Sequence, residues 1–174
     1  MKNIADIRQE YTKSGLRESE LPCDPLSLFS RWLQEAIDAN VEEPTAVIVG
    51  TVSPEGRPST RTVLLKGLHD GKFIFYTNYE SRKGRQLEQN PYISLSFVWH
   101  ELERQVHIEG TAAKVSPEES DEYFRKRPCK SRIGARISPQ SQPIASRMQL
   151  IRAFVKEAAR WLGKEVERPD NWGG

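Results

Sequence analysis

The sequence predicts a small antiparallel β-barrel with flanking helices, an α+β fold. Short segments rich in β-branched residues follow one another with turn-forming connections, as in an antiparallel meander. A helical segment interrupts this series, and longer helical patterns flank it on both sides. Consecutive strands with helices packed outside are typical of such barrels.

Length and composition are those of a single globular domain over residues 1–174, with helices within about 1–40. The hydrophobic fraction is 37% and the charged fraction is 29%, both ordinary values for globular proteins. The net charge of +2 is too small to predict a nucleic-acid partner. Neither a signal peptide nor a run of about 18 apolar residues is present, so we expect a cytoplasmic protein with no membrane partner.

Cysteine and histidine spacing argues against a metal site. Cys23 and Cys129 are far apart in the sequence, and the histidines at 69, 100 and 107 do not cluster with them. We therefore expect neither a disulfide framework nor a bound metal.

The first long helix is expected to begin at Asp24-Pro25, an N-cap followed by a proline at the first helical position. Apolar residues then recur at helical spacing, and the pattern fades near Asn40. After residue 44 the pattern changes to that of strands. The expected strands are 46–52, 59–66, 72–77, 92–99 and 105–115.

Three further helices are expected. One spans residues 80–90 with Ser81 as its cap, and another runs from the Ser116 cap to about Lys126. The last begins near Pro143 and carries an apolar stripe. That stripe consists of Ile144, Met148, Ile151, Val155, Ala158 and Leu162. The tail 165–174 is polar and is not expected to be helical.

Basic residues gather in a few short segments that suggest anion binding. The expected strand 59–66 has cations at Arg61 and Lys66, which an unbroken strand would place on opposite faces. They would then serve two ligands, unless a bulge intervenes; a solvated edge strand is the alternative. Arg82 and Lys83 fall in a first helical turn, where the helix dipole disfavours cations, so an anion is expected there.

A second basic segment follows residue 120. Tyr123 and Arg127 share one helix face, and Ser131 lies shortly beyond them. Together they are a reasonable phosphate clamp, although a merely solvated basic helix end fits the same pattern. Gln105 opens a strand and is able to bond a planar heterocycle, but alone it is a weak signal.

Taken together, these segments resemble the pyridoxine/pyridoxamine 5′-phosphate oxidase family over nearly the whole chain. The motifs that carry the resemblance are R-T-V-L-L-K, F-Y-T-N with S-R-K, W-H-x-L-E-R-Q-V, Y-F-x-x-R-P and the pair Gln140-Ser141. The resemblance implies an FMN-binding split barrel that forms a homodimer with the flavin at the subunit interface.

The resemblance also implies site residues. Those implied for FMN are Arg61, Thr62, Val63, Leu64, Leu65, Lys66, Tyr76, Thr77, Arg82, Lys83, Gln105, Gln140 and Ser141, with the last two coming from the partner subunit. Those implied for the substrate are Arg8, Tyr11, Lys66, Tyr123, Arg127 and Ser131.

The implied reaction oxidises pyridoxine 5′-phosphate or pyridoxamine 5′-phosphate to pyridoxal 5′-phosphate, with oxygen as acceptor and hydrogen peroxide as product. The family also has a segment with R-x-L-H-D-R after the W-G-G found here at Trp172–Gly174. Its arginine and histidine contact the substrate, so no catalytic residue is named in this sequence, which we expect to be a shortened form. The alternatives are a non-catalytic binder of FMN or pyridoxal phosphate and a flavin reductase or haem-related split barrel; the Y-F-x-x-R-P stretch argues against the latter pair.

Overall fold

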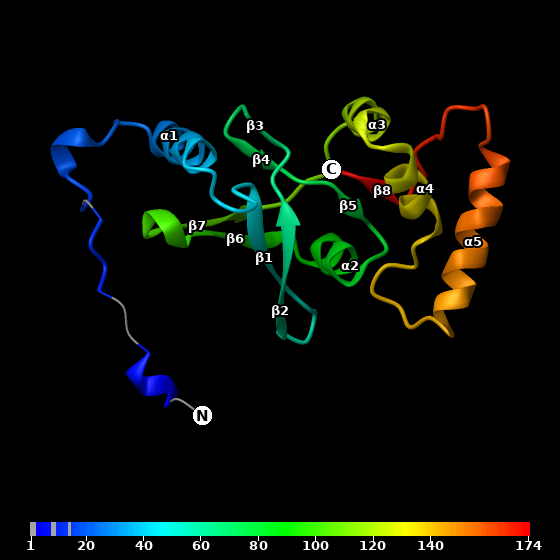
Figure 1. Ribbon diagram of the computed structural model, residues 1–174, viewed down its shortest axis with the longest axis horizontal. Helices are drawn as coiled ribbons and strands as arrows, with labels where there is room; N and C mark the ends of the chain where they lie inside the picture. The colour runs from blue at the N-terminus through cyan, green and yellow to red at the C-terminus, as the bar shows by residue number, and fades with distance from the viewer. Residues whose placement is uncertain (1–2, 8–9, 14) are drawn as a thin grey trace.

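A four-stranded antiparallel sheet forms the centre of the molecule. The computed structural model describes residues 3–7, 10–13 and 15–174 (Figure 1). The sheet has the order β2-β1-β6-β7, and each neighbouring pair is antiparallel. Its strands are β1 (Ala46–Val52), β2 (Pro58–Leu64), β6 (Tyr92–Trp99) and β7 (Arg104–Thr111).

Two small sheets complete the β structure. β3 (Gly67–His69) pairs with β4 (Lys72–Ile74), and β5 (Thr77–Asn78) pairs with β8 (Trp172–Gly173). The single strand expected over 72–77 is therefore wrong, because Phe75 and Tyr76 interrupt it between two ladders. The predicted antiparallel β fold with flanking helices is confirmed, with its ladders divided among three sheets.

The main core lies between this sheet and α1 (Pro25–Asp38). The Asp24 carboxylate caps the helix as predicted, by accepting hydrogen bonds from the N–H groups of Leu26 and Ser27. Phe29 of α1 packs edge-on against Phe73 and Phe97, with ring centroids 4.9 Å apart in each pair. Before α1, the described residues contain two short 3₁₀ turns, Ile4–Asp6 and Glu18–Glu20.

Four helices lie beyond the first core. α2 (Arg82–Gln89) packs beside β1, and α3 (Pro117–Lys126) adjoins β8. α4 (Cys129–Ile137) was not predicted, because Pro128 and the absence of a capping side chain conceal its start. It packs against α5 (Arg147–Arg160). A second core joins α3, α4, α5 and β8, and its buried residues are Phe124, Ile133, Val166 and Trp172.

Of the apolar stripe of the last helix, only Ala158 faces this core. Ile144 before the helix, Met148, Ile151 and Val155 on it, and Leu162 after it are all exposed. Phe154 and Trp161, which are not part of the stripe, join Ala158 in the contacts with the second core. Figure 1 shows α5 at the edge of the molecule, at the end opposite the N-terminal segment. Among the described residues, no helix is both long and apolar enough to cross a membrane.

Candidate functional site

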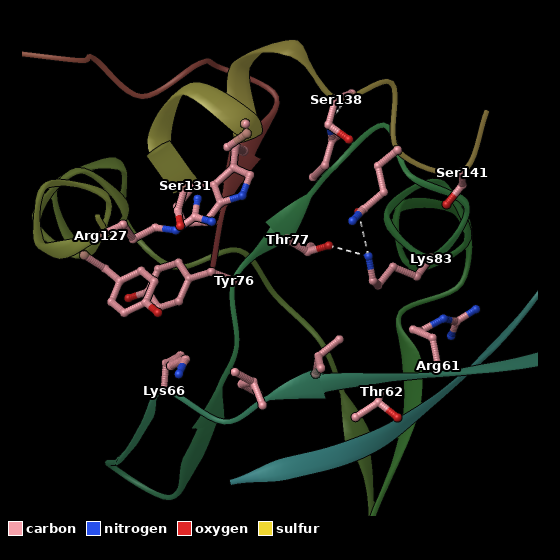
Figure 2. A pocket seen from close by; sticks show the side chains of 18 of the residues that line it. Arg61, Thr62, Lys66, Tyr76, Thr77, Lys83, Arg127, Ser131, Ser138 and Ser141 are labelled. Carbon is pink, nitrogen blue, oxygen red and sulfur yellow. Dashed lines mark hydrogen bonds between the residues drawn. The ribbon is translucent and has the colours of Figure 1, made fainter. Parts of the chain in front are cut away.

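A cavity of about 1100 Å³ lies between β2, β5, the start of α2, and the α3–α4 segment (Figure 2). None of the described residues that line it is aspartate or glutamate, whereas six are lysine or arginine. The six are Arg61, Lys66, Arg82, Lys83, Lys126 and Arg127. A concave surface with cations and without carboxylates attracts anionic ligands.

Lys83 is the most buried of these cations, with 7% of its surface exposed. Its ammonium group donates to the Thr77 hydroxyl at 2.5 Å, to the Ser81 hydroxyl at 3.1 Å and to the Gln140 amide oxygen at 3.0 Å. All three acceptors are neutral, so no negative charge compensates the ammonium within the described structure. Such a buried cation is prepared to pair with an anionic ligand.

Electrostatic repulsion in this cluster is visible in the pKa values. Burial, with the positive charge of Arg61 contributing, lowers the pKa of Lys83 to about 8. Burial also lowers the pKa of Arg61, and the positive charge of Arg82 adds to this lowering. An anion bound among these groups would relieve both effects.

Arg61 is oriented by a hydrogen-bond network that ties β2 to α2. Its guanidinium donates to the Thr51 hydroxyl and the Ser59 hydroxyl, each at 2.7 Å, and to the Val49 carbonyl at 3.0 Å. Both hydroxyls in turn donate to the amide oxygen of Gln86, which is buried on α2. The side chain of Arg61 is thus held in one place before any ligand arrives.

The N-terminus of α2 reaches the cavity because the helix begins very close to the preceding chain. The Ser81 hydroxyl accepts a hydrogen bond from the Gly84 N–H, as the predicted cap requires. A Cβ atom at Gly84 would lie 2.0 Å from the Tyr79 carbonyl oxygen, so only glycine fits there. This approach places Arg82 and Lys83 on the cavity wall.

The other end of the cavity is formed by Lys66, Tyr123, Arg127 and Ser131. Figure 2 shows Lys66, Arg127 and Ser131 together there, across the cavity from Arg61 and Lys83. One terminal nitrogen of Arg127, Nη1, is buried and has no hydrogen-bond partner among the described residues. Burial lowers the pKa of this guanidinium. A buried N–H group without a partner fits an oxygen-rich anion.

Two tyrosines stack beside Arg127. The rings of Tyr76 and Tyr123 are 3.9 Å apart at their centroids and nearly parallel. Burial raises the pKa of Tyr76 to about 12, with the negative charge of Glu119 contributing, so its hydroxyl stays protonated. Burial also raises the pKa of Tyr123, against the opposing effect of Arg127. Both hydroxyls are therefore able to donate hydrogen bonds.

Most of the predicted site residues line this one cavity. Arg61 and Lys66 do so together because β2 ends at Leu64, and Lys66 then turns to donate its N–H to the Ile74 carbonyl. The predicted residues on the cavity wall are Arg61, Thr62, Val63, Leu64, Lys66, Tyr76, Thr77, Arg82, Lys83, Tyr123, Arg127, Ser131, Gln140 and Ser141.

Three predicted residues of the described chain lie elsewhere. The side chain of Leu65 is in the main core, on the opposite side of the backbone from the cavity. Gln105 is exposed on β7, at the sheet edge farthest from β2. Tyr11 is 86% exposed, and the residues that follow it, Thr12 and Lys13, donate backbone N–H groups to the Glu103 carboxylate. Arg8 lies outside the described residues.

Gln140 and Ser141 require a correction. They were expected to come from a partner subunit, but both line the cavity of their own chain, where Gln140 bonds Lys83. The loop after α4 folds back over the start of α2, which brings them there (Figure 2). The motif predicted that the pair belongs to the site, but no local pattern shows which chain the loop covers.

Sequence reasoning missed the residues that orient the cations. Thr51, Ser59 and Gln86 depend on the pairing of β1 with β2 and on the packing of α2, which short motifs do not show. Trp172, which also lines the cavity, lies in the tail that was expected to be irregular. Its size and the two glycines that follow it were the available signals.

The fold and the site define a class: a small antiparallel α+β protein with a cavity for anionic ligands. Residues 33–162 match the family model described as pyridoxamine 5′-phosphate oxidase. The chain is 98% identical, over all its 174 residues and 82% of the relative, to the pyridoxine/pyridoxamine 5′-phosphate oxidase of Bacteroides thetaiotaomicron. It is 56% identical to the protein of that name from Porphyromonas gingivalis, over 99% of this chain and 80% of the relative.

Solved structures agree with this match. The crystal structure of PhzG from Burkholderia lata, in complex with tetrahydrophenazine-1-carboxylic acid, superposes with a TM-score of 0.86 at 29% identity, covering 92% of this chain and 80% of that one. A pyridoxamine 5′-phosphate oxidase-related, FMN-binding protein from Nostoc punctiforme shares the fold, with a TM-score of 0.69 at 18% identity over 87% and 79% of the two chains. The chain belongs to the pyridoxamine 5′-phosphate oxidase family.

Proposed function

We propose that this protein is an FMN-dependent oxidase that converts pyridoxine 5′-phosphate or pyridoxamine 5′-phosphate to pyridoxal 5′-phosphate. The observation that carries the proposal is the presence of two separate cation clusters in one cavity. FMN and the substrate each have one phosphate group, so a site for both needs two anion-binding ends. The names of the close relatives supply the identity of the substrate.

The end formed by Arg61, Arg82 and Lys83 suits the FMN phosphate. It combines the N-terminus of α2 with Arg61 and Lys83, whose lowered pKa values indicate that a negative charge is lacking. Thr77 and Gln140 hold the Lys83 ammonium in place for this contact. When bound, FMN supplies the hydride acceptor, which oxygen then reoxidises to give hydrogen peroxide.

The end formed by Lys66, Tyr123, Arg127 and Ser131 suits the substrate phosphate. Arg127 offers a buried N–H without a partner, and Tyr123 offers a protonated hydroxyl. Gripping the phosphate here would hold the reacting carbon of the substrate at a fixed distance from the flavin. The role of these residues is to bind and orient, and we assign no proton-transfer residue in this chain.

A homodimer is part of the proposal. On the outer face of the sheet, Ile48, Leu64 and Val98 are exposed, and the strand register places Gln105 on the same face. Leu64 also lines the cavity. A second copy that covers this face would bury its apolar residues and bring its own groups to the cavity opening, including the distant Gln105 and the N-terminal segment with Tyr11. The exposed stripe of α5 offers a second apolar surface for such contact.

A non-catalytic binder of FMN or pyridoxal phosphate is the second candidate. The same cation clusters would serve it, because they bind phosphates whether or not a reaction follows. Turnover separates the two functions. The FMN-loaded protein, given pyridoxine 5′-phosphate in air, should form hydrogen peroxide and an aldehyde product in equal amounts. Stable FMN binding without either product would favour the binder over the oxidase.

A further inference from the structure

Trp172 contacts the side chain that is proposed to grip the substrate phosphate. Its ring lies beneath the guanidinium of Arg127, with 4.5 Å between the Cζ atom and the ring centroid. Phe124 approaches the same guanidinium less closely, at 5.7 Å. Trp172 has only 6% of its surface exposed. Stacking of arginine on a buried tryptophan is among the stronger cation–π arrangements.

The backbone of Trp172 is held on both sides. Its strand, β8, pairs with β5, where Trp172 faces Asn78. Its N–H donates to the Pro169 carbonyl at 3.0 Å, and its carbonyl accepts from the Arg168 guanidinium at 2.7 Å. Arg168 is itself fixed by an ion pair with Asp121 on α3, at 2.6 Å. The ring is therefore attached to a rigid support.

The ring also continues the aromatic stack of the cavity. Its plane lies within 12° of that of Tyr76 and within 5° of that of Tyr123, with centroids 5.5 and 6.2 Å away. Tyr123 belongs to the same proposed phosphate grip as Arg127. The stacked rings thus position two side chains of the proposed phosphate grip, Tyr123 and Arg127.

Arg127 needs such support, because apart from the more distant Phe124 ring no contact described in the chain orients its guanidinium. No carboxylate forms an ion pair with it among the described residues, and its Nη1 is buried without a partner. An arginine side chain loses conformational entropy when it is fixed. A flat ring under the guanidinium restricts the side chain before the ligand binds, so less conformational freedom is lost on binding. It also leaves the N–H groups free to donate to oxygen atoms of the ligand.

We propose that Trp172 is a positioning residue for the substrate phosphate: it holds the guanidinium of Arg127 in its binding orientation. This rests on the proposed function, because it assigns Arg127 to the phosphate of the substrate. It follows that Trp172 sets the preference for phosphorylated over non-phosphorylated vitamers and has little influence on FMN. If Trp172 only packed in the second core, its replacement would lower the affinity for both ligands and the stability of the fold together.

The test measures binding of pyridoxal 5′-phosphate and of unphosphorylated pyridoxal to the FMN-loaded protein. Trp172→Leu keeps an apolar side chain but removes the ring, and should weaken pyridoxal 5′-phosphate by roughly tenfold or more. The affinities for pyridoxal and for FMN should stay within about twofold of the wild-type values, since neither ligand is proposed to contact Arg127. Trp172→Phe retains a ring and should recover most of the loss.

A matched control is Trp161→Leu. Trp161 lies under another guanidinium, that of Arg136 at 4.8 Å, but it does not line the cavity. Its replacement should leave the ratio of pyridoxal 5′-phosphate to pyridoxal affinity unchanged. Combining each Trp172 variant with Arg127→Ala shows whether the tryptophan acts through the arginine. In the Arg127→Ala background, the Trp172 change should cause no further loss of pyridoxal 5′-phosphate affinity.

Several results would overturn the inference. One is a Trp172→Leu variant that binds pyridoxal 5′-phosphate as tightly as wild type. Another is a loss of FMN affinity equal to the loss of pyridoxal 5′-phosphate affinity. The third is a loss that adds to that of Arg127→Ala in the double variant. If Trp172→Leu does not fold, Trp172→Phe with and without Arg127→Ala gives the same comparison. A wild type that binds pyridoxal 5′-phosphate but oxidises nothing would refute the proposed oxidase and leave the positioning role testable by binding. A wild type without preference for the phosphate would refute the role.

Discussion

The ammonium group of Lys83 donates a 3.0 Å hydrogen bond to the amide oxygen of Gln140, which lies 57 residues further along the same chain. This bond joins the start of α2 to the loop after α4 and closes one end of the cavity. It places a buried cation between neutral oxygens, with the positive charge uncompensated. We infer that the charge is compensated by the FMN phosphate.

Replacing Lys83 with methionine should weaken FMN binding by roughly tenfold to one-hundredfold, because one charge-assisted hydrogen bond contributes about 1.5–3 kcal/mol. Flavin fluorescence titration measures the dissociation constant. Arg85→Met is the control, since Arg85 is exposed on the same helix and does not line the cavity. Equal affinity of the Lys83 variant and wild type would remove Lys83 from the phosphate site.

The affinity for FMN should depend on pH through Lys83. Its pKa is about 8 in the free protein, and a bound phosphate would raise it, so binding above pH 8 takes up a proton. The affinity should therefore be highest below about pH 8 and fall above it, by up to roughly tenfold per pH unit. Titrations between about pH 7 and 9 test this. The same slope in Lys83→Met would assign the pH dependence to another group.

Gly84→Ala should destabilise the start of α2 and reduce FMN retention. The added methyl group would lie 2.0 Å from the Tyr79 carbonyl oxygen, a backbone atom that cannot rotate away. We expect a loss of about 1–3 kcal/mol in thermal or denaturant unfolding. Gly134→Ala is the matched control in α4, where no atom lies within 4 Å, and alanine there should stabilise by up to about 1 kcal/mol. Equal stability of the two variants would contradict the close approach.

Charges on the exposed stripe of α5 should disrupt the proposed homodimer. Met148→Glu with Val155→Glu would place two carboxylates at apolar contact positions, which should shift the mass in sedimentation or light scattering towards the monomer. Lys156→Glu, also exposed on α5, should have no such effect. A protein that is monomeric before mutation would refute the dimer, and an unchanged dimer in the double variant would exclude this stripe from the interface.

Much of the local structure was predictable from the sequence. β1 and β6 have the expected bounds because β-branched and aromatic residues make a strong strand signal. The starts of α1, α2 and α3 follow their capping residues. The start of α4 has no such cap, and α5 begins at Arg147 after the Ser146 cap rather than near Pro143. The stripe on α5 predicted a helix, but an apolar face alone does not show what covers it.

The site was predictable only where its residues form local motifs. Lys83 was found because a cation in a first helical turn suggests an anion there. Arg127 was found because it shares a helix face with Tyr123 and is followed by Ser131. The network from Gln86 through Thr51 to Arg61 joins three elements and depends on strand register. The support that Trp172 gives to Arg127 depends on pairing between β5 and β8, which are 94 residues apart at the paired residues Asn78 and Trp172. Such relationships require the tertiary structure.

The most direct test of the central claim is anaerobic mixing of the FMN-loaded protein with pyridoxine 5′-phosphate while the flavin absorbance is recorded. If the cavity holds both ligands as proposed, the absorbance of oxidised flavin should fall on mixing and return when air is admitted. Unphosphorylated pyridoxine at the same concentration should have far less effect. Flavin absorbance that stays constant with a saturating amount of the phosphorylated substrate would contradict the proposed oxidase.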